Sequence, residues 1–100
     1  MKMYILIKET VPEGFAILAA AHASLAAYLR FADESETKEW LSGPFYKVIC
    51  KVTEQEFEKA KGFEDHVVLT ESALEGAEVA IAFKPRTEWP KAFRFYRLYK

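Results

Sequence analysis

Apolar residues fall in short runs along the chain, and their spacing predicts alternating strands and helices. Residues 3–8 are almost continuously apolar, as in a strand that is buried on both faces. Residues 13–31 are apolar almost all round the helical period, so we expect a long helix that is covered on more than one side. Thr10 and Glu13 have the spacing of a capping box that would begin this helix.

Shorter elements are predicted in the rest of the chain. The charged stretch from Asp33 to Lys38 indicates a short helix that reaches Leu41. Thr53 and Glu56 form a second capping box, which would begin another short helix. Alternating or continuous apolar residues indicate three further strands, at 45–52, 66–70 and 77–83.

The order of these elements predicts the fold class. A strand, a helix and a second strand of the same sheet imply a parallel pair with a right-handed crossover. The close spacing of the last two long strands implies an antiparallel pair, and the last one has Val79, Ile81 and Phe83 on one face. We therefore expect one α/β domain over residues 1–100, with a mixed four-stranded sheet and helices on both faces.

The composition is that of an ordinary globular domain. Of the 100 residues, 51% are hydrophobic and 29% are charged, which excludes intrinsic disorder. The first apolar run is too short for a signal peptide, and His22 and Ser24 interrupt the charge-free stretch 14–29, so we expect no membrane span and a cytoplasmic protein. The one cysteine, Cys50, excludes a disulfide framework, and we expect it to be an inert apolar residue.

The net charge of −1 hides an asymmetry, because residues 84–100 carry +5 and residues 1–83 carry −6. Basic and aromatic residues alternate in this tail, a mixture that can bind nucleic acid through phosphate contacts and base stacking. It can equally pack its aromatic rings inside and expose its charges. The sequence does not decide the conformation after Pro85, which could be a short helix after Pro90 that is followed by an extended end. The candidate nucleic-acid contacts are Lys84, Arg86, Lys91, Arg94 and Arg97.

His22 lies among alanines in the middle of the long predicted helix. It is either a core histidine that is hydrogen-bonded to a neighbour, or a general base that faces a cleft. No histidine or cysteine lies one helical turn away from it, and the four glycines form no phosphate-binding loop. The sequence therefore predicts neither a metal nor a cofactor.

Short motifs along nearly the whole chain resemble those of one protein family. The matching segments are Lys2-Met3, Ile5–Lys8, Ala21–Ala23, Ala27-Tyr28, Trp40, Lys47–Lys51, Ala80–Pro85 and Arg97–Tyr99. Together they are similar to the motifs of the type II peptidyl-tRNA hydrolases, which cleave the ester between a nascent peptide and the 3′ ribose of tRNA. The resemblance implies that family's α/β fold, a homodimer and a tRNA-linked substrate.

The resemblance also implies candidate catalytic residues. The helix histidine matches the family's Ser-His-Ala motif, but the helix-opening lysine is replaced by Phe15 and a helical glutamine by Ala19. The family's loop aspartate aligns with Ser72 or with Val67, and a glutamate lies one residue from the first of these. The candidate catalytic residues are therefore His22, Glu71 and Ser72.

Two functions follow from this comparison of residues. One is a divergent peptidyl-tRNA hydrolase-like protein that hydrolyses or binds peptidyl- or aminoacyl-tRNA esters. The other is a catalytically degenerate, non-enzymatic dimeric module for binding or regulation, whose cleft is apolar because of Phe15 and Ala19. A second polar group within hydrogen-bond reach of His22 would favour the enzyme.

Overall fold

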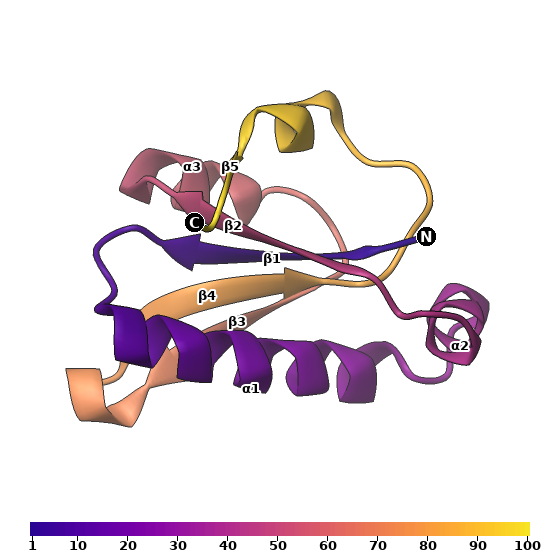
Figure 1. Cartoon of the computed structure of the whole chain (residues 1–100), viewed down its shortest axis with the longest axis horizontal. Helices are drawn as coiled ribbons and strands as arrows, with labels where there is room; N and C mark the ends of the chain where they lie inside the picture. The colour runs from indigo at the N-terminus through magenta and orange to yellow at the C-terminus, as the bar shows by residue number, and fades with distance from the viewer.

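A five-stranded mixed sheet forms the centre of the computed structural model, which describes residues Met1–Lys100 (Figure 1). The strands lie in the order β3-β4-β1-β2-β5. In chain order the elements are β1 (Met3–Lys8), α1 (Glu13–Phe31), α2 (Ser35–Ser42), β2 (Lys47–Val52), α3 (Glu54–Ala60), β3 (His66–Glu71), the 3-10 turn η1 (Ser72–Leu74), β4 (Ala77–Phe83), the 3-10 turn η2 (Lys91–Phe95) and β5 (Arg97–Leu98).

The sheet combines the two pairings that the sequence predicted. β1 and β2 are parallel and are joined by a helical crossover, whereas β3 and β4 form an antiparallel pair. The predicted four-stranded sheet is one strand short, because β5 pairs antiparallel with β2 through Arg97 and Leu98. Two residues carry no periodicity that a sequence pattern could detect, which explains the missing strand.

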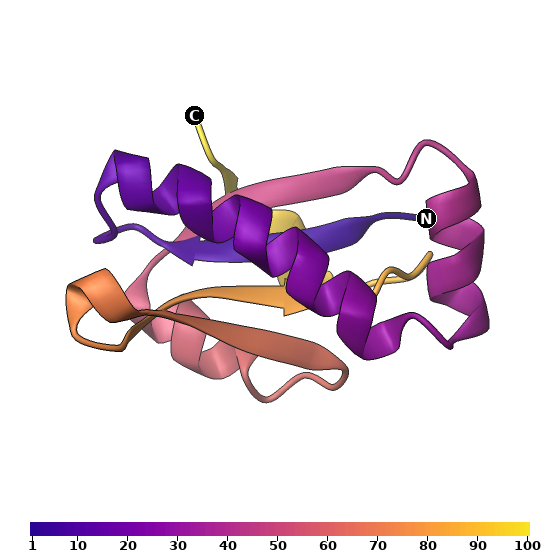
Figure 2. The same ribbon diagram turned by 90° about the horizontal axis from the view of Figure 1, so that it is seen from below.

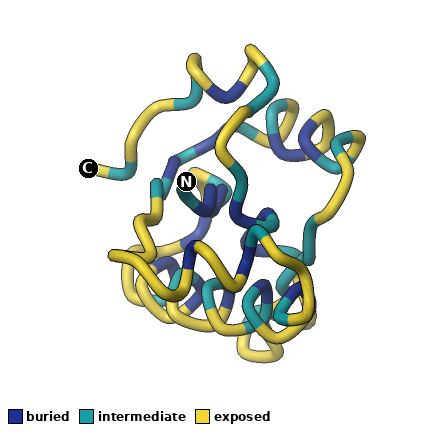
Figure 3. Tube along the Cα trace, turned by 90° about the vertical axis from the view of Figure 1, so that its right-hand side faces the viewer, coloured by how far each residue is buried: buried dark blue, intermediate teal, exposed yellow.

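The sheet separates two cores, and β1 contributes to both as predicted. Met3, Ile5 and Ile7 pack on the face that α1 covers. Tyr4 and Leu6 pack on the opposite face, with α3 and the C-terminal segment. Figure 2 shows α1 crossing the first face diagonally, and in Figure 3 the buried residues gather between the layers.

The predicted common face of Val79, Ile81 and Phe83 is wrong at its first residue. Ile81 and Phe83 belong to the α3 side of the sheet, whereas Val79 packs in the core beneath α1. The register between β3 and β4 shifts next to Leu69, where two residues of β4 lie opposite one of β3. Such a bulge turns the side chains beyond it to the other face of a sheet.

The two predicted capping boxes have different outcomes. The residue at the N-cap of α1 is Pro12, and no side chain caps this helix, so the predicted box with Thr10 is wrong. The second box is confirmed: the Thr53 backbone N–H donates to the Glu56 carboxylate at 2.8 Å, and the Glu56 N–H donates to the Thr53 hydroxyl at 3.1 Å. Proline has no side-chain acceptor, so Pro12 cannot accept a hydrogen bond from the first N–H groups of α1.

The C-terminal segment, whose conformation the sequence did not decide, packs over the α3 side of the sheet (Figure 1). Phe93 in η2 is buried, and its ring centroid lies 5.0 Å from that of Tyr4 and 4.9 Å from that of Trp89. Phe83 approaches the same ring at 5.1 Å. The aromatic residues of the tail therefore complete the second core rather than remain free.

Candidate functional site

The candidate catalytic residues do not come together. His22 is exposed on α1, and of the two histidines only His66 has a hydrogen-bonded ring. Glu71 accepts a hydrogen bond from the Ala73 N–H at 3.1 Å, and Ser72 is exposed in η1, beside the first turn of α1 (Figure 1). His22 lies nine residues into the helix, about 14 Å along its axis from that end. The imidazole therefore has no polar partner among these candidates.

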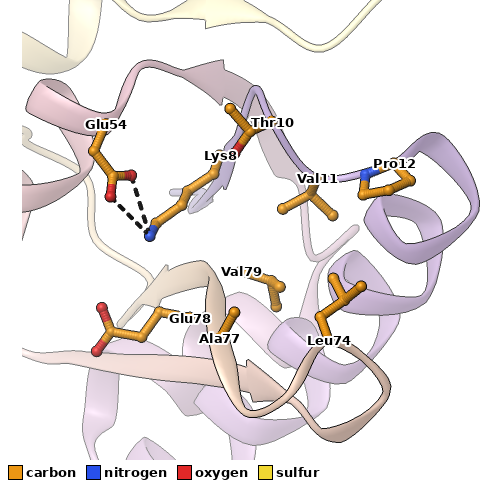
Figure 4. Close-up of a pocket in the computed structure, with 9 residues that line it drawn as sticks. All are labelled: Lys8, Thr10, Val11, Pro12, Glu54, Leu74, Ala77, Glu78 and Val79. Carbon is orange, nitrogen blue, oxygen red and sulfur yellow. Dashed lines mark hydrogen bonds and ion pairs between the residues drawn. The ribbon is translucent and has the colours of Figure 1, made fainter.

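A pocket of about 440 Å³ lies where the start of α1 meets the β3–β4 connection. Phe15, Ser72 and Val67, the positions that align with the family's lysine and aspartate, are not among the residues that line it. Figure 4 shows the Lys8 ammonium directed at the Glu54 carboxylate, with an apolar floor on the opposite side. The lining residues are Lys8, Thr10, Val11, Pro12, Glu54, Leu74, Ala77, Glu78 and Val79.

The charges of this pocket are neutralised within the protein. The Lys8 ammonium lies 3.1 Å from Glu54 and 4.7 Å from the centroid of the Phe57 ring, and Glu78 pairs with Lys61. The lining contains no histidine and no cysteine. No cluster of three His, Cys, Asp or Glu side chains in the chain is placed to hold a metal ion. The Thr10 hydroxyl lines the pocket but has no hydrogen bond to a base, so no activated nucleophile is formed there.

The apolar cleft that was expected at Phe15 and Ala19 is not lined by these two residues. Ala19 is buried and Phe15 is half-buried against the first core. An open apolar cavity of about 270 Å³ is found between α1 and β2 instead. It is lined by Ile7, Ala16, Ile17, Ala20, Ile49 and Tyr99.

Two of the five candidate cations in the tail are engaged in ion pairs. The Lys84 ammonium lies 2.8 Å from Glu36 and 3.1 Å from Glu34, and the hydrogen bond to Glu36 raises the pKa of Lys84. Arg97 pairs with Glu9 at 2.9 Å.

The other three candidate cations form no ion pair. The Arg86 guanidinium lies 5.3 Å from the centroid of the Trp89 ring. Lys91 and Arg94 are exposed on η2. Of the five candidate cations, these three are therefore the ones without an acidic partner in the protein, so the tail's charge of +5 overstates how many could bind a phosphate.

The feature that the sequence analysis missed is the outer face of α1. Ala16, Ala19, Ala23 and Ala27 are buried, so these four small side chains point toward the sheet. Four large aliphatic side chains of the helix point outward: Ile17 is 68%, Leu18 42%, Leu25 59% and Leu29 66% exposed. These alanines are three or four residues apart and so share one face of the helix, a spacing that could have indicated this orientation.

The outer face of α1 also lacks charge. Glu13 and Arg30, near its two ends, are the only charged residues of the helix. The outward side of a surface helix in a soluble protein is ordinarily polar. α1 is also long and apolar enough to cross a membrane, a test that a core helix of a soluble protein meets as well.

Comparisons with protein-family models and with curated proteins give no match for this chain.

Proposed function

We propose that this protein is a non-enzymatic module that binds a second copy of itself through the outer face of α1. The observation that carries this proposal is the orientation of the helix, with alanines toward the sheet and Ile17, Leu18, Leu25 and Leu29 toward solvent. Contiguous exposed apolar surface of this kind typically marks an interaction site in a soluble protein.

Burial of the apolar side chains of this face favours association. Complete burial of a leucine or isoleucine side chain stabilises by roughly 1.5–3 kcal/mol, and each protomer offers four that are already half exposed. Two protomers together therefore gain several kcal/mol against the entropic cost of forming a dimer.

The charges of α1 favour a second copy as the partner. Glu13 lies in the first turn and Arg30 in the last, with no charge between them. When two such helices pack antiparallel, the acidic end of each lies beside the basic end of the other. The two ends of the helix are thus complementary in charge in an antiparallel pair, the arrangement that a two-fold axis generates.

The absence of partners for His22 supports the non-enzymatic alternative. A general base needs a reacting group or an orienting group within hydrogen-bond reach, and His22 has neither beside it. We infer a fold related to the type II peptidyl-tRNA hydrolases in which Phe15 and Ala19 stand where the family has polar groups. This substitution pattern fits a scaffold that has kept its dimerisation and lost its chemistry.

Sedimentation velocity of matched variants tests the proposal. We expect the wild-type protein to be a dimer and Leu25→Glu to be a monomer, because the new carboxylate would be buried in the interface. Phe95→Glu is the control, since Phe95 is equally exposed but lies in η2, on the opposite side of the sheet. A monomeric wild type at high micromolar concentration, or a dimeric Leu25→Glu variant, would overturn the proposal.

The enzymatic alternative is tested by a hydrolysis assay on a peptidyl-tRNA, with the wild type beside His22→Ala. We expect no turnover from either protein, because the pocket at Lys8 contains no histidine or cysteine and His22 has no hydrogen-bonded partner. Turnover that disappears in the variant would contradict the non-enzymatic proposal and restore the hydrolase.

A further inference from the structure

We propose that the groove between α1 and β2 binds a small amphipathic carboxylate, whose alkyl chain fills the apolar cavity beside Ile49 and whose head group pairs with Lys51. The observations that carry this inference are the lining of the cavity and the position of the Lys51 ammonium beside it. The site lies within one chain, so it goes beyond the proposed dimer and does not depend on it.

The cavity of about 270 Å³ between α1 and β2 suits an alkyl chain. Five of its six lining side chains are aliphatic, and the sixth belongs to Tyr99, whose hydroxyl is the one polar side-chain atom in the lining. Ala16 and Ala20 lie one turn apart on α1, and their short side chains leave space between the helix and Ile49. A polar group placed there would lose its hydrogen bonds to water, whereas a hydrocarbon chain loses none. The cavity therefore favours an aliphatic ligand.

This cavity adjoins a second recess that contains charged side chains. The two spaces share Ile17 and Tyr99 in their linings. Lys51 lies two residues beyond Ile49 on β2 and so faces the same side of the sheet, toward α1. Its ammonium lies 4.5 Å from the centroid of the Tyr99 ring, which borders both spaces. A ligand whose chain fills the cavity can therefore place its head group beside this cation.

Lys51 forms no ion pair in the protein, although its side chain is half-buried. Three of the other four half-buried lysines pair with a glutamate: Lys8, Lys61 and Lys84. Of the two glutamates that line the recess, Glu9 pairs with Arg97 at 2.9 Å, and Glu13 is exposed and unpaired. The exposed Lys100 in the same lining offsets the charge of Glu13. The ammonium of Lys51 is therefore available to an external anion.

The charge and size of the site define the class of ligand. One half-buried ammonium matches a head group with a single negative charge, and a carboxylate accepts charge-assisted hydrogen bonds from it. The cavity is slightly smaller than the roughly 300–1,000 Å³ of typical small-molecule sites, so the alkyl chain must be short. A medium-chain fatty carboxylate such as octanoate satisfies both conditions.

Isothermal titration calorimetry with octanoate, below the concentration at which it forms micelles, tests the class of ligand. We expect saturable binding of octanoate and none of octylammonium, whose head group Lys51 repels. Butanoate should bind at least about tenfold more weakly, because each buried methylene group contributes up to about fourfold to the dissociation constant. Equal affinities for octanoate and octylammonium, or no saturable binding of octanoate, would overturn the proposal.

Two lysine variants test the contact with the head group. Lys51→Gln removes the charge, so we expect the dissociation constant for octanoate to rise about three- to tenfold. Lys47→Gln is the matched control, because Lys47 lies on the same face of β2 and its ammonium is also 4.5 Å from an aromatic centroid, that of Phe45, but it lines neither space. This control should bind octanoate like the wild type. Equal weakening by both variants would contradict the pairing of the head group with Lys51.

Two alanine variants test the place of the alkyl chain. Ala20→Leu fills the cavity with a larger side chain and should abolish octanoate binding. Ala21→Leu, at an exposed neighbouring position that lines neither space, should bind like the wild type. Circular dichroism verifies that both variants are folded. A folded Ala20→Leu variant with unchanged affinity would show that the chain does not lie in this cavity.

The Leu25→Glu variant separates this inference from the proposed function. Leu25 lines neither space, so this variant should bind octanoate with the affinity of the wild type. A monomeric wild type that binds octanoate would remove the dimer and support the site. Octanoate binding by Leu25→Glu but not by the wild type would show that a second copy covers the groove, and the ligand would then be excluded.

Discussion

Thr37 is a buried residue whose hydroxyl has no hydrogen-bond partner. A buried hydroxyl without a partner loses its hydrogen bonds to water and gains none in exchange. We therefore expect Thr37→Val, which has nearly the same shape, to raise the free energy of unfolding by about 1 kcal/mol. Urea denaturation measures this change, and Thr37→Ser, which keeps the hydroxyl and removes the methyl group, should destabilise instead.

Stability should fall in alkaline solution, because every resolved pKa shift is upward. Burial raises the pKa of the Cys50 thiol from 9.0 to about 11. The hydrogen bond to Glu36 raises the pKa of Lys84, and burial raises the pKa of Tyr96. A group whose pKa is higher in the folded state contributes stability below its unfolded pKa, and this contribution is lost as the pH rises.

The alkaline effect of Cys50 is directly measurable. We expect the free energy of unfolding to decrease between pH 9 and pH 11 by about 2 kcal/mol from this thiol. Cys50→Ala should show a shallower decrease over the same range. An identical pH dependence in both proteins would show that the thiol does not titrate as its burial implies.

At the scale of elements, α1 is set apart by its inward alanines. Ala23 is completely buried between α1 and the sheet, so a larger side chain there forces the helix outward. We expect Ala23→Leu to lower the free energy of unfolding by about 2 kcal/mol through overpacking. Thermal denaturation checks this, and an unchanged midpoint would indicate that the helix can shift without cost.

The sequence predicted the elements with strong local patterns and failed where distant residues decide. The predicted bounds 13–31 of α1 agree with the structure, because the apolar segment is long and Pro12 directly precedes the helix. Its orientation was missed, because a helix that is apolar all round does not reveal which side meets the sheet. The alanine spacing was informative only together with the sheet itself.

The same limit explains what was missed at the candidate site. The pocket beside Lys8 combines residues from the ends of β1, α3 and β4 with the loops between, which no local motif joins. The ion pairs that engage Lys84 and Arg97 reach residues far away in the chain. Charge counting alone therefore overestimated the number of basic side chains in the tail that are free to bind a nucleic acid.

At the scale of the whole molecule, the C-terminal segment is part of the core. Phe93 is buried and contacts the rings of Tyr4, Phe83 and Trp89. We expect Phe93→Ala to lower the free energy of unfolding by about 3–5 kcal/mol, because it opens a cavity under the segment. Urea denaturation measures the loss, and Phe95→Ala, at an exposed neighbouring position, should change little.

The central place of β1 in the sheet bears on how the chain reaches its native state. β1 is synthesised first, yet one of its two neighbours is β4, near the other end of the chain. Pairing across such separations closes long loops, so folding should take milliseconds to seconds rather than microseconds. During synthesis α1 leaves the ribosome long before β3 and β4, the two later strands that pack against it. For that interval the side of the helix that β3 and β4 later cover is open to water, and nascent chains become prone to aggregate.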